Sequence, residues 1–151
     1  MAFAELGDTD RAWALCSMLN PIRHAMDADG VNRYKVEPYV IAADIYGASP
    51  HTGRGGWSWY TGAAGWMYRL LVETLLGVHL EGELLRLNPR LPSDWPSLKL
   101  HYRFRDTFYH ITVTRGVDAK PRQLLLDGGG QPDGGIHLID DRQDHTIDLT
   151  V

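Results

Sequence analysis

Cysteine is almost absent from this chain of 151 residues: Cys16 stands alone, so no disulfide can form within it. Cys16 lies in the helical-looking run RAWALCSML, where a small buried apolar residue is the ordinary role of a thiol. Buried thiols are inert. We therefore expect neither a disulfide-stapled protein nor a thiol-dependent enzyme.

Long apolar runs are missing as well. The longest, residues 70–78, is interrupted by Glu73 and is far shorter than the roughly 20 residues that a membrane-spanning helix needs. The opening MAFAELGDTD has neither the basic nor the apolar region of a secretory signal. We expect no transmembrane helix and a cytoplasmic location.

Clusters of basic residues are also lacking. The net charge is −4 and the Lys and Arg residues are scattered, which disfavours a nucleic-acid partner, because phosphate backbones are bound by gathered cations. None of the seven His has metal-ligand spacing to a second His or Cys, so no metal site is expected. Aromatic residues are plentiful, with five Trp and seven Tyr; such rings fill cores more often than they stack on sugars.

The first half of the chain has helical spacing. From Asp8 or Thr9 as N-cap, apolar residues recur every three or four positions, and Pro21 follows the end of this helix. Residues 22–34 are polar and are expected to form a loop, while residues 36–47 are compatible with an extended or a helical segment. A second helix follows the glycine-rich segment.

This second helix is expected to run from about Thr61 to Leu76, with Gly77 as the left-handed residue that ends it. Its apolar residues occupy two adjoining faces, so it is predicted to be buried, with Trp66 in the core.

After Gly82 the pattern alternates between apolar and polar residues, as in strands. The expected strands are ELLRLNP, LKLHYRFR, FYHITVTR, RQLLLDG, IHLID and HTIDLTV. Asp106 and Thr107 are expected to form the tight turn between the second and third of these, and the glycine-rich residues 127–135 a turn. The sequence thus predicts an α+β chain with a helical part, 1–80, and an antiparallel β domain, 81–151.

The glycine-rich segment 53–69, GRGGWSWYTGAAGWMYR, runs into the second helix through Thr61 and Gly62. The first amides of a helix lack internal partners and carry positive potential, and glycine lets an anion approach them. From the residues alone, however, the plainer alternative is favoured: Thr61 as an N-cap and the glycines as turn residues. No Lys follows the glycines, so the nucleotide-binding P-loop pattern is not met.

Residues 35–69, KVEPYVIAADIYGASPHTGRGGWSWYTGAAGWMYR, resemble the C-terminal catalytic pattern of the family 94 glycoside phosphorylases. The EPYV element, the GRGGW-WYTG-AGWMYR element and the LP-DWP segment at 91–96 look most like the cyclic β-1,2-glucan synthases; cellobiose and chitobiose phosphorylases are more distant. The resemblance implies the C-terminal helices of an (α/α)6 barrel followed by an antiparallel β-sandwich.

The resemblance also implies functional residues. A Thr-Gly pair of the family contacts phosphate, so Thr61 and Gly62 are expected phosphate ligands. Glu37, in EPYV, lies in a stretch that lines the sugar-binding end; the alternative is a structural pairing of Glu37 with Arg54 or another barrel residue.

Arg54, Trp59 and Tyr60 are further candidate substrate-binding residues. Where cellobiose phosphorylases have a Gln after EPYV, this chain has Ala42, Ala43 and Asp44, which puts a cellobiose subsite in doubt.

The family reaction is phosphorolysis with inversion, in which inorganic phosphate is a co-substrate and an Asp general acid protonates the leaving oxygen. No other cofactor is expected. The family's general acid, and an Arg and a His of its phosphate site, lie upstream of the matched region. We therefore expect the chain alone to be inactive, to act with an upstream barrel polypeptide on a β-glucan or gluco-oligosaccharide, and to self-associate in isolation.

A second interpretation is a non-catalytic carbohydrate-binding or structural module, in which the aromatic loop holds a glycan without cleaving it. Phosphate binding near Thr61 distinguishes the two. Association of a parent protein with the inner membrane stays open at this point.

Overall fold

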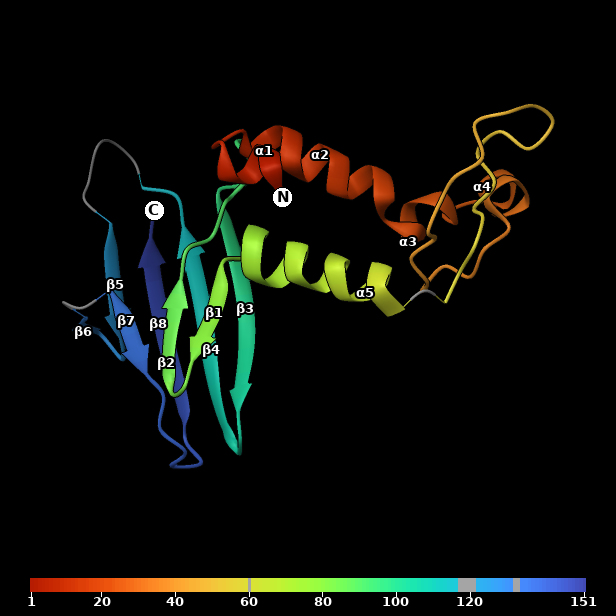
Figure 1. The fold of residues 1–151 in the computed structure, drawn as a ribbon. Coiled ribbons are helices and arrows are strands. Elements are labelled where there is room, and N and C mark those ends of the chain that lie inside the picture. The colour runs from red at the N-terminus through yellow and green to blue at the C-terminus, as the bar shows by residue number, and fades with distance from the viewer. Residues whose placement is uncertain (60, 117–121, 132–133) are drawn as a thin grey trace. The chain divides into compact units, whose positions relative to one another are not determined.

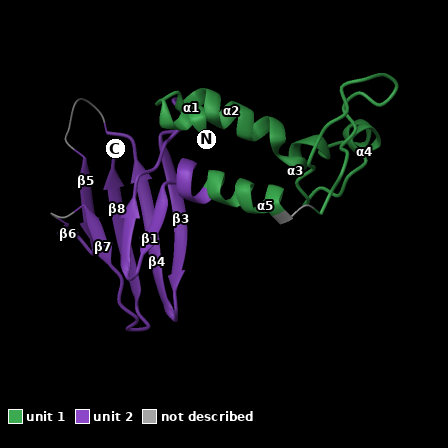
Figure 2. Ribbon diagram, viewed as in Figure 1, with its two compact units in different colours: residues 1–71 green, residues 72–151 purple. Residues whose placement is uncertain are grey.

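The computed structural model describes residues 1–59, 61–116, 122–131 and 134–151, with Thr61 described by its backbone alone (Figure 1). The chain forms two compact units, Met1–Leu71 and Val72–Val151 (Figure 2). Helices make up the first and strands dominate the second, so the α+β prediction is confirmed. No helix in the described part of the chain is long and apolar enough to cross a membrane.

The helices are α1 (Ala2–Glu5), α2 (Thr9–Leu19), α3 (Pro21–His24), α4 (Ala28–Tyr34) and α5 (Thr61–Tyr68), which continues as a π-helical segment, Arg69–Leu75. The strands are β1 (Val78–Glu81), β2 (Leu84–Leu87), β3 (Ser97–Phe104), β4 (Thr107–Thr114), β5 (Gln123–Leu126), β6 (Gly129–Gly130), β7 (Gly135–His137) and β8 (Asp144–Thr150).

Helix α2 begins where the sequence predicts. The carboxylate of Asp8 accepts a hydrogen bond from the amide of Arg11 at 3.3 Å, so Asp8 is the N-cap. Ala12 and Cys16 are the buried residues of this helix. Burial raises the pKa of the Cys16 thiol, which keeps it protonated and unreactive at neutral pH.

The prediction of a loop over residues 22–34 is wrong, because α3 and α4 occupy it. Each has a side-chain cap: Asn20 Oδ1 accepts from the amide of Ile22, and Asp27 Oδ1 accepts from the amide of Gly30 at 2.7 Å. Gly30 is no helix breaker here. A side chain at that position would press on the carbonyl oxygen of His24, so glycine permits the close approach of α3 and α4.

Helix α5 is more exposed than its apolar sequence predicts. The side chain of Trp66, expected in the core, is 60% exposed. An apolar face is buried only where another element covers it, and the described residues of the first unit leave much of α5 uncovered. Burial increases in the π-helical segment, where Thr74 and Leu75 are buried. Gly77, with φ of +65°, ends the helix in the left-handed conformation, as predicted.

The strands form two sheets. One has the order β1-β2-β7 and is antiparallel; the other has the order β3-β4-β8-β5-β6. In the second, β4 and β8 are parallel, which corrects the prediction of a purely antiparallel domain. A hairpin turn forces its strands to be antiparallel, but β8 reaches β4 only after a long connection, which permits either direction.

The β3–β4 turn lies one residue earlier than predicted. Phe104 pairs with Thr107, so Arg105 and Asp106 are the turn residues, and Arg105 has a φ of +54°. Thr107 is instead buried in β4, where its hydroxyl accepts from the amide of Arg142 at 2.7 Å and donates to Asp140 at 3.2 Å.

Both sheets contribute to one hydrophobic core. The inward-facing residues of β4 and β8 alternate with polar ones, as the sequence pattern requires. The buried members of this core are Leu85, Leu87, Leu91, Tyr109, Ile111, Val113, Leu124, Ile136, Leu138, Ile147 and Leu149.

Candidate functional site

The segment that carries the EPYV and GRGGW elements folds back on itself. The amide of Ala43 donates to the carbonyl of Trp57 at 2.7 Å, Ile45 and Gly55 form an isolated antiparallel bridge, and the amide of Tyr46 donates to the carbonyl of Arg54 at 2.9 Å. These bonds make residues 43–57 a two-stranded loop that leads directly to Trp59 and to the start of α5.

The acidic residue of this loop, Asp44, stabilises the loop itself. Its Oδ1 accepts a hydrogen bond from the amide of Trp57 at 2.9 Å. Gly56 is required beside it, because a side chain there would overlap the Asp44 carboxylate. Asp44 thus has a structural role that fixes the path of the chain toward Trp59.

The residues on either side of this loop contact each other: Trp59, which follows it, meets Glu37 and Tyr39, which precede it. The indole N–H of Trp59 donates to Glu37 Oε1 at 3.2 Å, and the rings of Tyr39 and Trp59 meet edge to face with centroids 6.3 Å apart. Both rings are largely exposed, Tyr39 by 74% and Trp59 by 70%. Exposed aromatic faces beside a carboxylate acceptor suit the apolar faces and hydroxyl groups of a sugar.

The backbone of Trp59 is strained, with a φ of +64°, a conformation that bulky residues rarely adopt and that is common at functional sites. The structural pairing of Glu37 expected as the alternative is formed with Trp59 rather than with Arg54: among the described residues, Glu37 bonds to Trp59 and forms no ion pair with Arg54. The backbone of Arg54 bonds to His51 and Tyr46.

Helix α5 begins at Thr61, two residues after Trp59. Its first amides have no partner within the helix. Gly62 faces open space, since a β-carbon there would meet no atom within 4 Å. The predicted contacts of Tyr60 and of the Thr61 hydroxyl lie outside the described residues, so these two assignments stay predictions.

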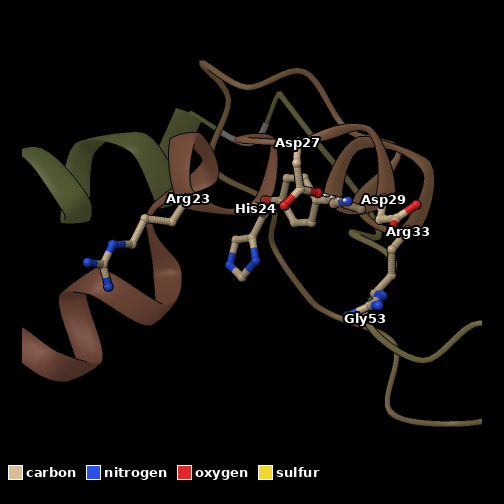
Figure 3. Close-up of a pocket in the computed structure, with 8 residues that line it drawn as sticks. Arg23, His24, Asp27, Asp29, Arg33 and Gly53 are labelled. Carbon is tan, nitrogen blue, oxygen red and sulfur yellow. Dashed lines mark hydrogen bonds between the residues drawn. The ribbon is translucent and has the colours of Figure 1, made fainter.

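A polar cavity of about 400 Å³ lies between α3, α4 and Gly53 (Figure 3). Its lining includes basic and acidic side chains. The lining residues are Arg23, His24, Asp27, Asp29, Gly30, Arg33, Tyr34 and Gly53. Figure 3 shows the side chains of Arg23 and Arg33 pointing in different directions, so they do not converge on one anion.

The ring of His24 stacks on that of Tyr34 at 4.7 Å and Asp27 caps α4, so both have structural roles. Sequence reasoning missed this cavity because it treated residues 22–34 as a loop; the caps Asn20 and Asp27 were the available signal.

An apolar hollow of about 300 Å³ lies in the same unit. Its lining is Met1, Leu19, Ile41, Ala42, Ala43, Ala63, Trp66, Met67 and Leu70. Ala42 and Ala43 therefore face an apolar surface.

Two family models match this chain. The family model of the glycosyl hydrolase 94 superfamily, catalytic domain, matches residues 1–77, and that of the glycosyl hydrolase family 65, C-terminal domain, matches residues 78–117.

Three curated relatives illustrate the similarity. A cyclic beta-(1,2)-glucan synthase of Rhizobium meliloti is 47% identical over 76% of this chain and 4% of its own length. A cellobionic acid phosphorylase of Neurospora crassa is 30% identical over 97% of this chain and 18% of its own length. An N,N'-diacetylchitobiose phosphorylase of Vibrio proteolyticus is 33% identical over 85% of this chain and 16% of its own length.

The chain thus spans less than a fifth of the length of each of these relatives. The glycosyl hydrolase 94 family model matches residues 1–77, which include both the EPYV element and the glycine-rich element that leads into α5. The chain belongs to the glycosyl hydrolase 94 superfamily.

Proposed function

We propose that this chain supplies the C-terminal part of a family 94 enzyme that acts on β-linked glucans with inorganic phosphate. One observation carries the proposal: Trp59, whose exposed ring is hydrogen-bonded to Glu37, lies two residues before the start of α5. A sugar-stacking surface and an anion-binding backbone are therefore consecutive in the chain, as a reaction between a sugar and phosphate requires.

In this proposal the amides of Thr61 and Gly62 hold phosphate and Glu37 accepts hydrogen bonds from sugar hydroxyls. Trp59 stacks on a sugar ring, and Arg54 and Tyr60 are further substrate contacts. Phosphate then attacks the anomeric carbon with inversion while a general acid from an upstream barrel polypeptide protonates the leaving oxygen.

The substrate proposed is a β-1,2-linked glucan. Its support is the 47% identity to a cyclic beta-(1,2)-glucan synthase and the apolar surroundings of Ala42 and Ala43, which do not suit a cellobiose subsite. The helices would complete an (α/α)6 barrel, and the two sheets would form the β-sandwich that follows it. We further propose a cytoplasmic location, with the parent protein at the inner membrane, and no cofactor besides phosphate.

The experiment that tests the phosphate site is a titration of the isotope-labelled chain with inorganic phosphate, followed by amide NMR. We expect the signals of Gly62 and Ala63 to move. Gly62→Asp should abolish the shifts, because its carboxylate would occupy the anion position. Gly65→Asp is the matched control, since a side chain at Gly65 also meets open space one turn further along. Phosphate shifts that survive Gly62→Asp would contradict the assignment.

A parallel titration with β-1,2-gluco-oligosaccharides tests the sugar surface. The indole signal of Trp59 should move, and that of Trp95, which packs against the core of the second unit, should not. Glucan binding without any phosphate binding would favour the non-catalytic carbohydrate-binding module instead.

A further inference from the structure

Two histidines face each other on the β3–β4 hairpin. The register pairs His101 with His110 directly across the two strands. Their Nδ1 atoms are 2.6 Å apart, and the ring centroids are 4.9 Å apart with the planes nearly perpendicular. Tyr109 and Ile111, the strand neighbours of His110, belong to the core, and Leu100 and Tyr102, those of His101, pack against it. Both imidazoles therefore lie on the opposite, outer face of the sheet.

A carboxylate orients one of these rings from the far side. Asp144, at the start of β8, places its Oδ2 3.4 Å from His110 Nε2. When His110 donates its Nε2 proton to Asp144, its Nδ1 lone pair points at His101. A carboxylate that holds the second nitrogen of an imidazole is the usual outer partner of a metal-bound histidine.

We propose that His101 and His110 bind a divalent transition-metal ion through their Nδ1 atoms, with Asp144 as the positioning residue and solvent completing the coordination. The ion would link β3 to β4. Imidazole nitrogen suits Zn²⁺, Ni²⁺ and Cu²⁺, and the general affinity order places Cu²⁺ above Zn²⁺.

The geometry needs only a small adjustment. Two nitrogens bound tetrahedrally at about 2.0–2.1 Å from zinc lie about 3.3 Å apart, so the Nδ1 atoms, now at 2.6 Å, must separate by roughly 0.7 Å. The side chain of His110 is 39% exposed and that of Asp144 is 70% exposed, which leaves room for both the movement and solvent ligands. Arg103, on the same strand face, is bonded to Asp106 and to the carbonyl of Arg105 at the hairpin end.

This is an open, two-histidine site. Within the described ranges, no group of three or more His, Cys, Asp or Glu side chains could hold a metal. The spacing of the histidines in sequence gives no metal-ligand signal, because the pairing depends on the register of the hairpin. The proposal is independent of the reaction assigned to the first unit, since all three residues lie in the second.

The test is titration of the whole chain with Zn²⁺, followed through the imidazole carbon-bound proton signals and by calorimetry. We expect saturable binding that shifts the signals of His101 and His110. His101→Ala and His110→Ala should each weaken binding at least tenfold, and Asp144→Asn by about tenfold to a hundredfold. Cu²⁺ should bind more tightly than Zn²⁺.

His137→Ala is the matched control, because His137 is also exposed on a strand but pairs with Leu84; it should leave the affinity unchanged. The competing explanation of the His101–His110 contact is a simple hydrogen bond between the two rings that binds no metal. The proposal is overturned if Zn²⁺ leaves the His101 and His110 signals of the parent chain unmoved, a measurement that depends on no variant. It is also overturned if His101→Ala binds Zn²⁺ as tightly as the parent chain does.

Discussion

At the scale of single residues, His145 joins several parts of the second unit. Its Nδ1 lies 2.7 Å from Asp127 Oδ2, its Nε2 lies 3.2 Å from Asp141 Oδ1, and its ring stacks on Tyr109 at 5.0 Å. The hydroxyl of Tyr109 in turn donates to the carbonyl of Ile139 and accepts from its amide. A single imidazole thus ties β8 to the β5–β6 turn and to the loop before β8.

This network makes stability depend on pH. Hydrogen bonds to Asp127, and then to Asp141, raise the pKa of His145 above 6.5. The pKa values of both carboxyls are lowered below 3.8, that of Asp127 mainly by the backbone amide of Thr146 and that of Asp141 mainly by the backbone amide of Gln143, with His145 adding to each. The His145 contribution is therefore complete below pH 6.5 and is lost as the pH rises through the raised pKa; the carboxyl contributions are present above pH 3.8 and are lost as the pH falls.

We expect the urea midpoint of the second unit to decrease between pH 6 and pH 9. His145→Gln should cost about 1–2 kcal/mol at pH 6 and flatten that decrease. His137→Gln, on an exposed strand position, should keep the parent's pH profile. A decrease of the same size in His145→Gln would show that other groups cause it.

At the scale of elements, the sequence predicted most where the pattern is local. Strands β3 and β4 follow from strict alternation, and Gly77 follows from the end of an apolar helix. The sequence did not predict pairing between distant segments, because such pairing depends on the tertiary fold. Two examples are the parallel alignment of β4 with β8 and the contact of Glu37 with Trp59, 22 residues apart. The exposure of Trp66 was missed for the same reason, since apolar spacing shows which face seeks cover but not what covers it.

Substitutions at Gly77 and Gly82 allow the cost of backbone strain to be distinguished from the cost of steric overlap. Gly77 and Gly82 both have a φ of +65°. A β-carbon at Gly77 would overlap the backbone carbonyl of Asn88, whereas one at Gly82 would meet no atom within 4 Å. Strain alone costs about 1–2 kcal/mol, and overlap with backbone adds to it.

Gly82→Ala should therefore lower the free energy of unfolding of the second unit by about 1 kcal/mol, and Gly77→Ala by about 2–4 kcal/mol. Urea denaturation of the two variants beside the parent chain measures the difference. Equal losses would mean that the 88–89 backbone moves freely away from Gly77.

At the scale of the whole molecule, the two units differ in how completely they cover their apolar residues. The core of the second unit contains residues of both its sheets. The first unit leaves many large apolar side chains exposed: Leu6, Met18, Leu19, Ile22, Met26, Val31, Trp57, Trp59, Trp66 and Tyr68. Single exposed apolar residues are ordinary, but a surface this rich in them is typical of one that binds a partner. In the proposed enzyme that partner is the rest of the barrel.

A prediction about association follows from this difference in exposed apolar side chains. Purified alone, the chain should self-associate, and Met18→Glu with Met26→Glu should reduce the association, because both side chains are exposed in the first unit. Lys99→Glu, at an exposed position of β3 in the second unit, is the control and should leave the association unchanged. Sedimentation velocity over a range of concentrations measures these outcomes.

The same chain should release no detectable glucose 1-phosphate from β-1,2-gluco-oligosaccharides and phosphate. In the proposed enzyme the general acid and the rest of the barrel belong to an upstream polypeptide. Loss of a general acid typically costs about 10²–10⁴ in rate, and assay without the rest of that proposed barrel removes substrate positioning as well. Adding an upstream family 94 barrel polypeptide should restore product, and Gly62→Asp should abolish that restored activity while Gly65→Asp keeps it. Product formed by the chain alone would mean that one of its own carboxylates, such as Glu37, Asp44 or Glu73, acts as the acid.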